Sequence, residues 1–416
     1  MSDSAVHSET KLGLKENWQQ FSLLVLVNAF VGSMVGLERT ILPLLAEDAF
    51  GVASRTAILS FIVTFGVAKA LSNLFAGRAS DNFGRKRILV LGWLFGLPVP
   101  FIIMFAPAWS WIVAANVFLG INQGLAWSST VIMKIDLVGP KNRGLAMGLN
   151  EASGYIAVGL AALASGYIAS RYGLGVESFY LGAVIAVVGF LLSITFVRET
   201  KDHALLEARE TQHPDADHTF SKVFAMTSWK NRSLFSVSQA GLVNNLNDGM
   251  AWGLFPILFA ASGFSIEKIG ILAATYPLVW GLGQLWTGSL SDKIGRKKLI
   301  VVGMQLQAIG IFLMLFVESF WFLLGAMGLM GIGTACVYPT LIAAIGDVSH
   351  PNWRATAVGV YRLWRDSGYV VGALLVGVIT DLIDTDWALG TVGGLTALSG
   401  MVVLLMMKET LPRNPL

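Results

Sequence analysis

Residues 77–86 read "GRASDNFGRK", and residues 288–297 repeat this stretch as "GSLSDKIGRK", 211 positions further along the chain. Each copy directly follows a long apolar segment. A second polar signature recurs at the same offset: Asp136, Pro140, Arg143, Ala146 and Gly148 return as Asp347, Pro351, Arg354, Ala357 and Gly359. Two repeated signatures between matching apolar segments indicate that the chain consists of two parallel copies of one unit.

The composition places this repeated unit in a membrane. Only 13% of the residues are charged, 55% are hydrophobic and the mean hydropathy is +0.66, which excludes an ordinary soluble protein. About 20 apolar residues cross the hydrocarbon core as a helix, and the chain has about twelve apolar runs of that length. We therefore predict an all-α polytopic membrane protein with twelve transmembrane helices in two pseudo-symmetric six-helix halves. A β-barrel would show short alternating segments, which the sequence lacks.

The predicted helices divide the chain into two bundles and three other segments. We expect helices at 18–44, 55–76, 86–106, 110–135, 143–170 and 177–197, and again at 233–260, 266–287, 298–317, 320–345, 355–380 and 388–407. The segments are an N-terminal segment (1–17), an N-terminal bundle (18–197), a linker (198–232), a C-terminal bundle (233–407) and a C-terminal tail (408–416). We expect a solvated linker, and a short amphipathic helix on the membrane surface is the alternative.

Lysine and arginine concentrate in the short loops that follow the even-numbered helices, whereas the opposite loops carry mainly acidic residues. The positive-inside rule therefore predicts that both termini and the linker are cytoplasmic. These basic loops also account for the net charge of +3, so we predict no nucleic-acid partner. The first apolar run is too long for a cleavable signal peptide, and we expect an integral protein of a bacterial-type cytoplasmic (inner) membrane.

The doubled signature resembles the loop between helices 2 and 3 of the major facilitator superfamily, which reads G-x-L-x-D-x-x-G-R-[RK]. The second copy matches it throughout, and the first departs only with Ala79 in place of leucine. The resemblance covers the whole chain and implies alternating access, in which the two halves rock about a central site. In such a loop glycine provides a tight turn, an acid can cap a helix N-terminus, and basic residues hold the cytoplasmic interface. The predicted gating residues are Gly77, Asp81, Gly84, Arg85, Lys86, Gly288, Asp292, Gly295, Arg296 and Lys297.

Polar side chains inside the predicted helices are candidates for the central site, because ionisable groups within a membrane are costly. Three helices carry them at helical spacing, with Arg362, Arg365, Asp366 and Tyr369 on one, Gln123, Trp127, Thr130 and Lys134 on another, and Asn244, Asp248 and Trp252 on a third. We expect these stripes to face a central cavity, although polar packing between helices would give the same pattern. The predicted substrate-binding residues are Arg39, Gln123, Trp127, Asn244, Trp252, Arg362 and Arg365.

Lys69 and Asp366 form a predicted conformational pair. In the family that the chain resembles, helices 2 and 11 meet across the two halves, and both residues lie at a similar depth in those helices. We therefore expect an ion pair between them that forms in one state and breaks in the other.

Residues 38–40, "ERT", lie in the first helix and resemble the acid–arginine pair of organic-anion symporters within the superfamily. The resemblance implies that Arg39 binds the anionic group of the substrate and that Glu38 titrates. Proton coupling needs a buried carboxylate that takes up and releases a proton, and the candidates are Glu38, Glu151 and Asp248.

These observations predict a secondary active transporter, coupled to protons, for a small organic anion. The alternative is proton-driven efflux of hydrophobic drugs or metabolites, which the many tryptophans and tyrosines would suit, and a remote alternative is a non-transporting membrane sensor. The sequence has no G-x-x-x-x-G-K-[ST] loop, nucleophile–base arrangement or metal motif, so we expect neither an enzyme nor a cofactor. The expected partners are a small-molecule substrate, protons and the lipid bilayer, and we expect a monomer.

Overall fold

The computed structural model describes residues 10–139, 143–210, 219–317, 319–349 and 351–411, with the side chains of all except residues 78, 81, 143–145, 207–210, 351, 352 and 355. In these residues every regular element is a helix. The N-terminal half contains α1 (Trp18–Asp48), α2 (Arg55–Phe83), α3 (Arg85–Gly96), α4 (Pro98–Met104), α5 (Trp109–Asn122), the π-helix η1 (Gln123–Trp127), α6 (Ser128–Val138), α7 (Arg143–Tyr172) and α8 (Glu177–Thr195). The C-terminal half contains α11 (Arg232–Ala261), α12 (Ile266–Ile294), α13 (Arg296–Leu313), α14 (Phe320–Val348), α15 (Pro351–Leu382) and α16 (Thr385–Met406).

Both halves match the predicted order of six spans. Within the described residues, nine helices are long and apolar enough to cross a membrane. The three other expected spans are not among these nine helices, each for a local reason. The π-helix η1 interrupts one span between α5 and α6, α13 begins with three basic residues, and α11 carries the polar run "NNLND" at 244–248. The linker is not simply a connector, because it contains α9 (Lys201–Glu210), α10 (Phe220–Ala225) and the π-helix η3 (Met226–Lys230).

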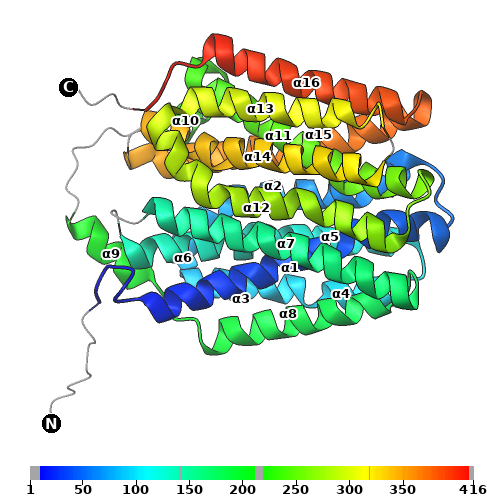
Figure 1. Cartoon of the computed structure of the whole chain (residues 1–416). Coiled ribbons are helices and arrows are strands. Elements are labelled where there is room, and N and C mark those ends of the chain that lie inside the picture. Colours follow the sequence, from blue (N-terminus) through cyan, green and yellow to red (C-terminus); the bar gives the residue numbers. More distant parts are fainter. Residues whose placement is uncertain (1–9, 140–142, 211–218, 318, 350, 412–416) are drawn as a thin grey trace.

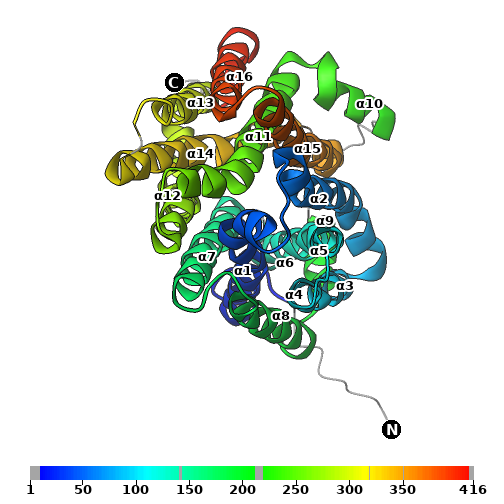
Figure 2. The ribbon, with the colours of Figure 1, turned by 90° about the vertical axis from the view of Figure 1, so that its right-hand side faces the viewer.

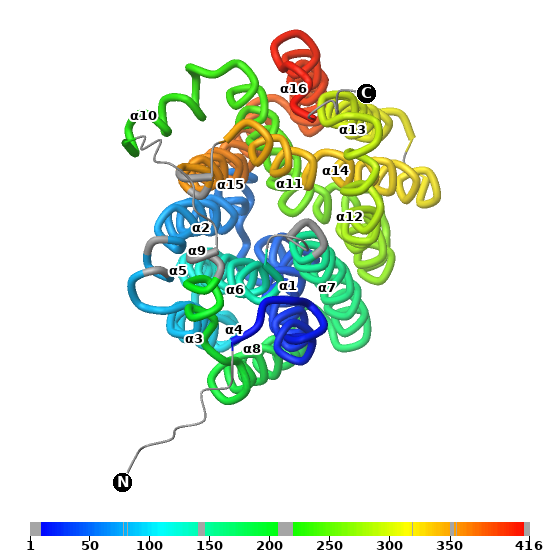
Figure 3. The backbone as a smooth tube through the Cα atoms, turned by 90° about the vertical axis from the view of Figure 1, so that its left-hand side faces the viewer, coloured from blue at the N-terminus to red at the C-terminus, as the bar shows by residue number. Residues whose placement is uncertain are grey.

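The beginning of α1 and the end of α16 lie at the same end of the molecule, which we call the terminus side (Figure 1). Two helix pairs join the halves along their length: α2 lies beside α15, and α7 lies beside α12 (Figures 2 and 3). Small residues permit this approach. A Cβ added at Gly166 of α7 would lie 2.8 Å from the Cα of Gly270 in α12, and one at Gly66 of α2 would lie 2.9 Å from the Cβ of Tyr369 in α15.

The halves pack less closely on the terminus side. A Cβ added at Gly77, Gly148, Gly288 or Gly359, near the terminus-side ends of α2, α7, α12 and α15, would meet no heavy atom within 4 Å. The glycine contacts described above lie deeper in the molecule or toward its opposite face. The halves are therefore in close contact in the interior and toward the face away from the termini, and have open space beside these four helix ends.

Replacing Gly166 with valine should destabilise this conformation, because the new side chain overlaps the backbone of α12. Overpacking of this kind costs about 1–3 kcal/mol. The expected result is a lower thermal unfolding midpoint for the purified protein in detergent. Gly148→Val is the matched control on the same helix, since open space surrounds Gly148. Equal midpoints for the two variants would show that the close contact of α7 and α12 does not hold this conformation.

Candidate functional site

The repeated signatures form the turns that end α2 and α12 on the terminus side. Gly84 and Gly295 have φ angles of 93° and 100°, which glycine adopts without a steric penalty. Gly77 and Gly288 do not turn the chain, contrary to the expected hinge loop, because α2 and α12 continue through them. The predicted loop is thus a one-residue turn between two helices.

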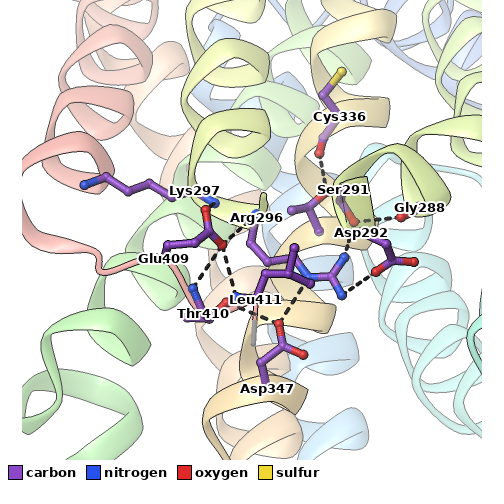
Figure 4. Close-up of polar contacts among 11 residues, drawn as sticks. Gly288, Ser291, Asp292, Arg296, Lys297, Cys336, Asp347, Glu409, Thr410 and Leu411 are labelled. Atoms are coloured by element: carbon purple, nitrogen blue, oxygen red, sulfur yellow. Dashed lines mark hydrogen bonds and ion pairs between the residues drawn. The ribbon is translucent and has the colours of Figure 1, made fainter. Parts of the chain in front are cut away.

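Two glutamates from outside the signatures cap the helices that follow these turns. The carboxylate of Glu199 accepts hydrogen bonds from the N–H groups of the first two residues of α3, at 3.0 and 3.1 Å. Glu409 accepts the equivalent bonds from α13, at 2.8 and 3.2 Å (Figure 4). A carboxylate in this position satisfies free N–H groups and stabilises the positive end of the helix dipole.

The signature acid has a different contact. Asp292 does not cap α13 but pairs with Arg296 at 2.6 Å, and Arg296 also binds Asp347 at 3.1 Å (Figure 4). Thr410 donates a hydrogen bond to the same Asp347 carboxylate at 3.2 Å. The first half repeats these contacts with Arg85, Asp136 and Thr200. The side chain of Asp81 lies outside the described residues.

Glu199 and Glu409 were not among the predicted site residues, although the sequence carries a signal for them. Residues 198–200 read "RET" and residues 408–410 read "KET", just after the sixth and twelfth helices. Glu199 and Glu409 are 210 positions apart, whereas the repeated signatures are 211 apart. Aligning the two halves at an offset of 211 therefore does not pair these two glutamates. The residues Lys86 and Lys297 contribute their backbone N–H groups to these caps.

Replacing Glu409 with alanine should lower the free energy of unfolding by about 1 kcal/mol, the usual effect of losing a helix N-cap. Glu199→Ala should cost a similar amount, and the two effects should add because the caps lie in different halves. Chemical unfolding of the purified variants measures this, with Glu267→Ala as the control: Glu267 is an exposed acid in the first turn of α12, whose N-cap is Ser265. If the Glu409 variant matches the Glu267 variant, the cap does not stabilise the fold.

Arg39 is buried in α1 without the hydrogen bonds that a buried cation usually makes. Its side chain is 2% exposed, and none of its three guanidinium nitrogens has a hydrogen-bond partner. The guanidinium stands over the rings of Phe65 at 4.7 Å, Trp252 at 5.0 Å and Phe61 at 5.4 Å. Cation–π contacts partly offset the desolvation of this charge, but all five N–H donors remain unused.

A small cavity opens beside Arg39, between α1, α7, α11, α12 and α14. Its lining is mostly apolar: Arg39, Val158, Ala162, Ala251, Trp252, Ala273, Tyr276, Pro277 and Met327. We call it the arginine cavity. Its volume is about 10 Å³, room for about one water molecule, so the halves must move apart before a solute can enter.

Two acids lie near the arginine cavity without lining it. Glu38 is 2% exposed, and neither of its carboxylate oxygens has a hydrogen-bond partner. Asp248 accepts a hydrogen bond from the hydroxyl of Tyr276, while its second oxygen has no partner. Both acids interact electrostatically with Arg39, but neither forms a hydrogen bond with its guanidinium.

A second cavity of similar size lies between α2, η1, α6, α7, α14 and α15, and we call it the polar cavity. Its lining is Lys69, Asn73, Trp127, Ser128, Glu151, Tyr155, Tyr338, Arg362 and Arg365. One oxygen of Glu151 accepts hydrogen bonds from Trp127 at 3.0 Å and from Asn150 at 3.1 Å, while the other has no partner. Of the three acids predicted for proton coupling, Glu151 alone lines either cavity.

A chain of aromatic rings connects the two cavities. Tyr155 of the N-terminal half stacks on Trp280 of the C-terminal half with a centroid distance of 3.5 Å and an interplanar angle of 26°. Trp280 also contacts Tyr276 of the arginine cavity and Tyr338 of the polar cavity, at 5.8 and 5.2 Å. Since these rings come from both halves, their contacts must rearrange when the halves move.

The predicted ion pair of Lys69 and Asp366, both of which the structure describes, is not formed. Asp366 instead binds Arg365 at 2.6 Å, Asn245 at 3.3 Å and Asn73. The ammonium of Lys69 stands over three aromatic rings and attracts Asp366 only at longer range. Asp366 does not pair with Lys69 because the guanidinium of Arg365, the preceding residue, binds the Asp366 carboxylate directly. A pair in another conformation remains a prediction.

The residues of the predicted stripe on the fourth span, which includes the π-helix η1, do not share one environment. Trp127 lines the polar cavity, whereas Gln123, Thr130 and Lys134 bind α1 through Val31, Asn28 and Leu24. Asn244 likewise binds Gln307 within its own half at 3.0 Å. Substrate contact by Gln123 and Asn244 is thus only a prediction, and neither lines the arginine cavity or the polar cavity.

The structure brings the other predicted substrate residues together in two groups. Arg39 and Trp252 meet at the arginine cavity, and Trp127, Arg362 and Arg365 meet at the polar cavity. Arg362 crosses between the halves, since its guanidinium donates to Ser128 at 3.0 Å. Within the described parts of the chain, no three His, Cys, Asp or Glu side chains gather closely enough to hold a metal ion.

Comparison with known proteins identifies this architecture. The model of the Major Facilitator Superfamily matches residues 21–243 and 237–416. The chain belongs to the major facilitator superfamily. It is therefore a membrane transporter with the superfamily's two-domain fold of twelve helices, and not an enzyme.

Individual relatives are distant. The chain is 24% identical over 381 residues to "Multidrug resistance protein MdtG" of Salmonella arizonae, covering 88% of this chain and 89% of that protein. It is likewise 24% identical over 380 residues to the protein of that name in Salmonella typhi. Among solved structures, a POT family transporter in complex with a thioalcohol conjugated peptide superposes with a TM-score of 0.75 at 14% identity, covering 95% of this chain and 98% of that one. The nucleoside transporter NupG gives 0.71 at 14% identity, covering 94% and 100%.

Proposed function

We propose that this transporter moves small organic anions that carry an aromatic ring, coupled to protons, by alternating access of the bundles at 18–197 and 233–407. The observation that carries this proposal is the state of Arg39. A buried guanidinium with no hydrogen-bond partner is costly unless a ligand supplies acceptors, and arginine matches the two oxygens of a carboxylate or sulfonate. Trp252, Phe61 and Phe65 surround it with ring faces that suit an aromatic substrate.

Glu151 is the proposed coupling group. One of its carboxylate oxygens has no hydrogen-bond partner, and Glu151 lines the polar cavity together with Arg362 and Arg365 of the other half. A proton bound there and an anion bound at Arg39 both change the charge balance between the halves. The basic signature loops lie on the terminus side, so we further propose that this side is cytoplasmic in a bacterial-type inner membrane, with the protein acting as a monomer.

A second candidate function is efflux of hydrophobic drugs. Two observations favour it: the curated relatives described above carry the name "Multidrug resistance protein", and aromatic rings extend continuously from one cavity to the other. An amphipathic cation would find ring faces and the carboxylate of Glu151 on that path.

A matched pair of probes separates the two candidates. Naphthalenesulfonate and a naphthyl trimethylammonium salt share a ring system and carry permanent opposite charges, so neither shuttles protons through lipid by itself. The purified protein in liposomes with an internal pH-sensitive dye is given each compound in turn. Proton movement with the sulfonate alone supports the anion proposal. Proton movement with the ammonium alone supports efflux of cationic drugs, and no movement with either contradicts both.

A further inference from the structure

We propose that Asp381 is a latch between the two halves, which holds the face opposite the termini closed and so stabilises the conformation described here. Asp381 lies at the end of α15, in the C-terminal half. Its carboxylate accepts three hydrogen bonds from the beginning of α2, in the N-terminal half. The donors are the backbone N–H of Arg55 at 2.6 Å, the backbone N–H of Thr56 at 2.9 Å and the hydroxyl of Ser54 at 2.6 Å.

The geometry is that of a helix N-cap supplied by another domain. The first N–H groups of α2 have no partner within their own helix, and a negative charge there also interacts favourably with the helix dipole. Ser54, the N-cap residue of α2, both donates to Asp381 and accepts from the N–H of Ala57 at 3.2 Å. The side chain of Arg55 pairs with Glu47 of α1 and is also attracted by Asp381. The latch therefore joins α15 to both α1 and α2.

Close packing directly beside the latch fixes its position. A Cβ added at Gly377, one turn before Asp381, would lie 2.7 Å from the Cα of Thr56. Only a glycine lets α15 approach the beginning of α2 closely enough for the carboxylate to reach the N–H groups. When this face opens in alternating access, α2 and α15 must separate here, and all three hydrogen bonds across the interface must break.

The pseudo-symmetric interface lacks the latch, which shows that the repeated fold does not require it. The residue equivalent to Asp381 in α7 is Ser170, whose hydroxyl binds the carbonyl of Tyr167 in its own helix. The N-terminus of α12 is capped by its own Ser265. At that interface α7 and α12 pack through the glycine contact and through the stack of Tyr155 on Trp280, and the start of α12 is capped from within its own half. The carboxylate therefore biases one particular conformation and is not a general feature of the repeat.

The proposal predicts a shift of the conformational equilibrium that does not depend on the identity of the substrate. Asp381→Asn removes the charge and weakens three bonds made only when this face is closed. Losing a helix cap of this kind should increase the population of molecules in which the face opposite the termini is open by roughly three- to thirtyfold. Asp384→Asn is the matched control: Asp384 lies three residues further on but caps α16 within its own half, accepting from the N–H of Trp387 at 2.8 Å.

Spin-label distances measure this shift on both faces of the full-length protein. The single cysteine, Cys336, is first replaced by serine. One labelled pair, Phe83→Cys with Ile294→Cys, reports on the terminus side, and another, Tyr172→Cys with Phe316→Cys, reports on the opposite face. All four residues are exposed, with relative accessibilities of 62%, 44%, 72% and 76%.

The expected result is that Asp381→Asn shortens the terminus-side distance and lengthens the opposite one in a larger fraction of molecules. Asp384→Asn should leave both distance distributions as in the parent. Ser54→Ala removes one of the three bonds and should shift the populations in the same direction by a smaller amount, which tests the proposal even if the Asp381 variant does not fold. Unchanged distributions in Asp381→Asn, or in Ser54→Ala where the former cannot be purified, would overturn the proposal.

Discussion

Replacement of Arg39 by alanine is expected to weaken binding of naphthalenesulfonate by about 3 kcal/mol, roughly a hundredfold or more, which corresponds to the loss of two charge-assisted hydrogen bonds. The effect is large because Arg39 is buried against aromatic rings, where no solvent can replace its N–H groups. Isothermal titration calorimetry of the purified protein measures the affinity directly.

Two control variants make the result specific. Arg39→Lys keeps the charge but loses the planar fork, so it should recover only part of the affinity. Arg171→Ala removes another arginine that stacks on a ring, Tyr167, but lies exposed at the end of α7. It should bind as tightly as the parent. Undiminished binding by Arg39→Ala would mean that the guanidinium is a structural group.

Replacement of Glu151 by glutamine is expected to uncouple transport from protons. An amide at this position can still accept hydrogen bonds from Trp127 and Asn150, so the packing of α7 against η1 is preserved. It cannot take up and release a proton. Accumulation of naphthalenesulfonate driven by an imposed pH gradient should therefore fall to the level of empty liposomes, while exchange of internal for external compound continues.

Glu38 and Asp248, the other two acids predicted for proton coupling, serve as controls for Glu151. Glu38→Gln and Asp248→Asn change buried carboxylates that line neither cavity. Both variants should retain accumulation driven by the pH gradient. If Asp248→Asn uncouples transport and Glu151→Gln does not, the coupling proton binds beside Tyr276 rather than in the polar cavity.

The architecture was predictable because its signals are long and repeated. Twelve apolar runs and two signatures at one offset determine the number of spans, their order and the family, and the family model confirms that reading. The end of α2 was less predictable. A glycine within a helix costs only about 1 kcal/mol, and at Gly77 the helix continues despite it. The positive φ that turns the chain is needed only at Gly84.

The candidate site was predictable in its residue types but not in its pairings. The sequence indicates that Arg39, Lys69, Glu151 and Asp366 lie within the membrane, yet a partner depends on side-chain reach. Arg365 is adjacent to Asp366 in sequence and binds it in place of Lys69. Helical periodicity in the sequence reveals neither the π-helix η1 nor the contacts of Gln123, Thr130 and Lys134 with α1. The caps from Glu199 and Glu409 come from distant segments, and only the folded chain places them beside the turns.

The most direct test of the central claim compares proton movement in liposomes that contain the parent protein or Arg39→Ala, with naphthalenesulfonate added outside and a pH-sensitive dye inside. Both proteins must first be shown to be inserted in equal amounts. We expect the sulfonate to change the internal pH with the parent protein and Arg39→Ala to give the signal of empty liposomes. An equal pH change with both proteins would show that anion transport does not depend on the buried guanidinium.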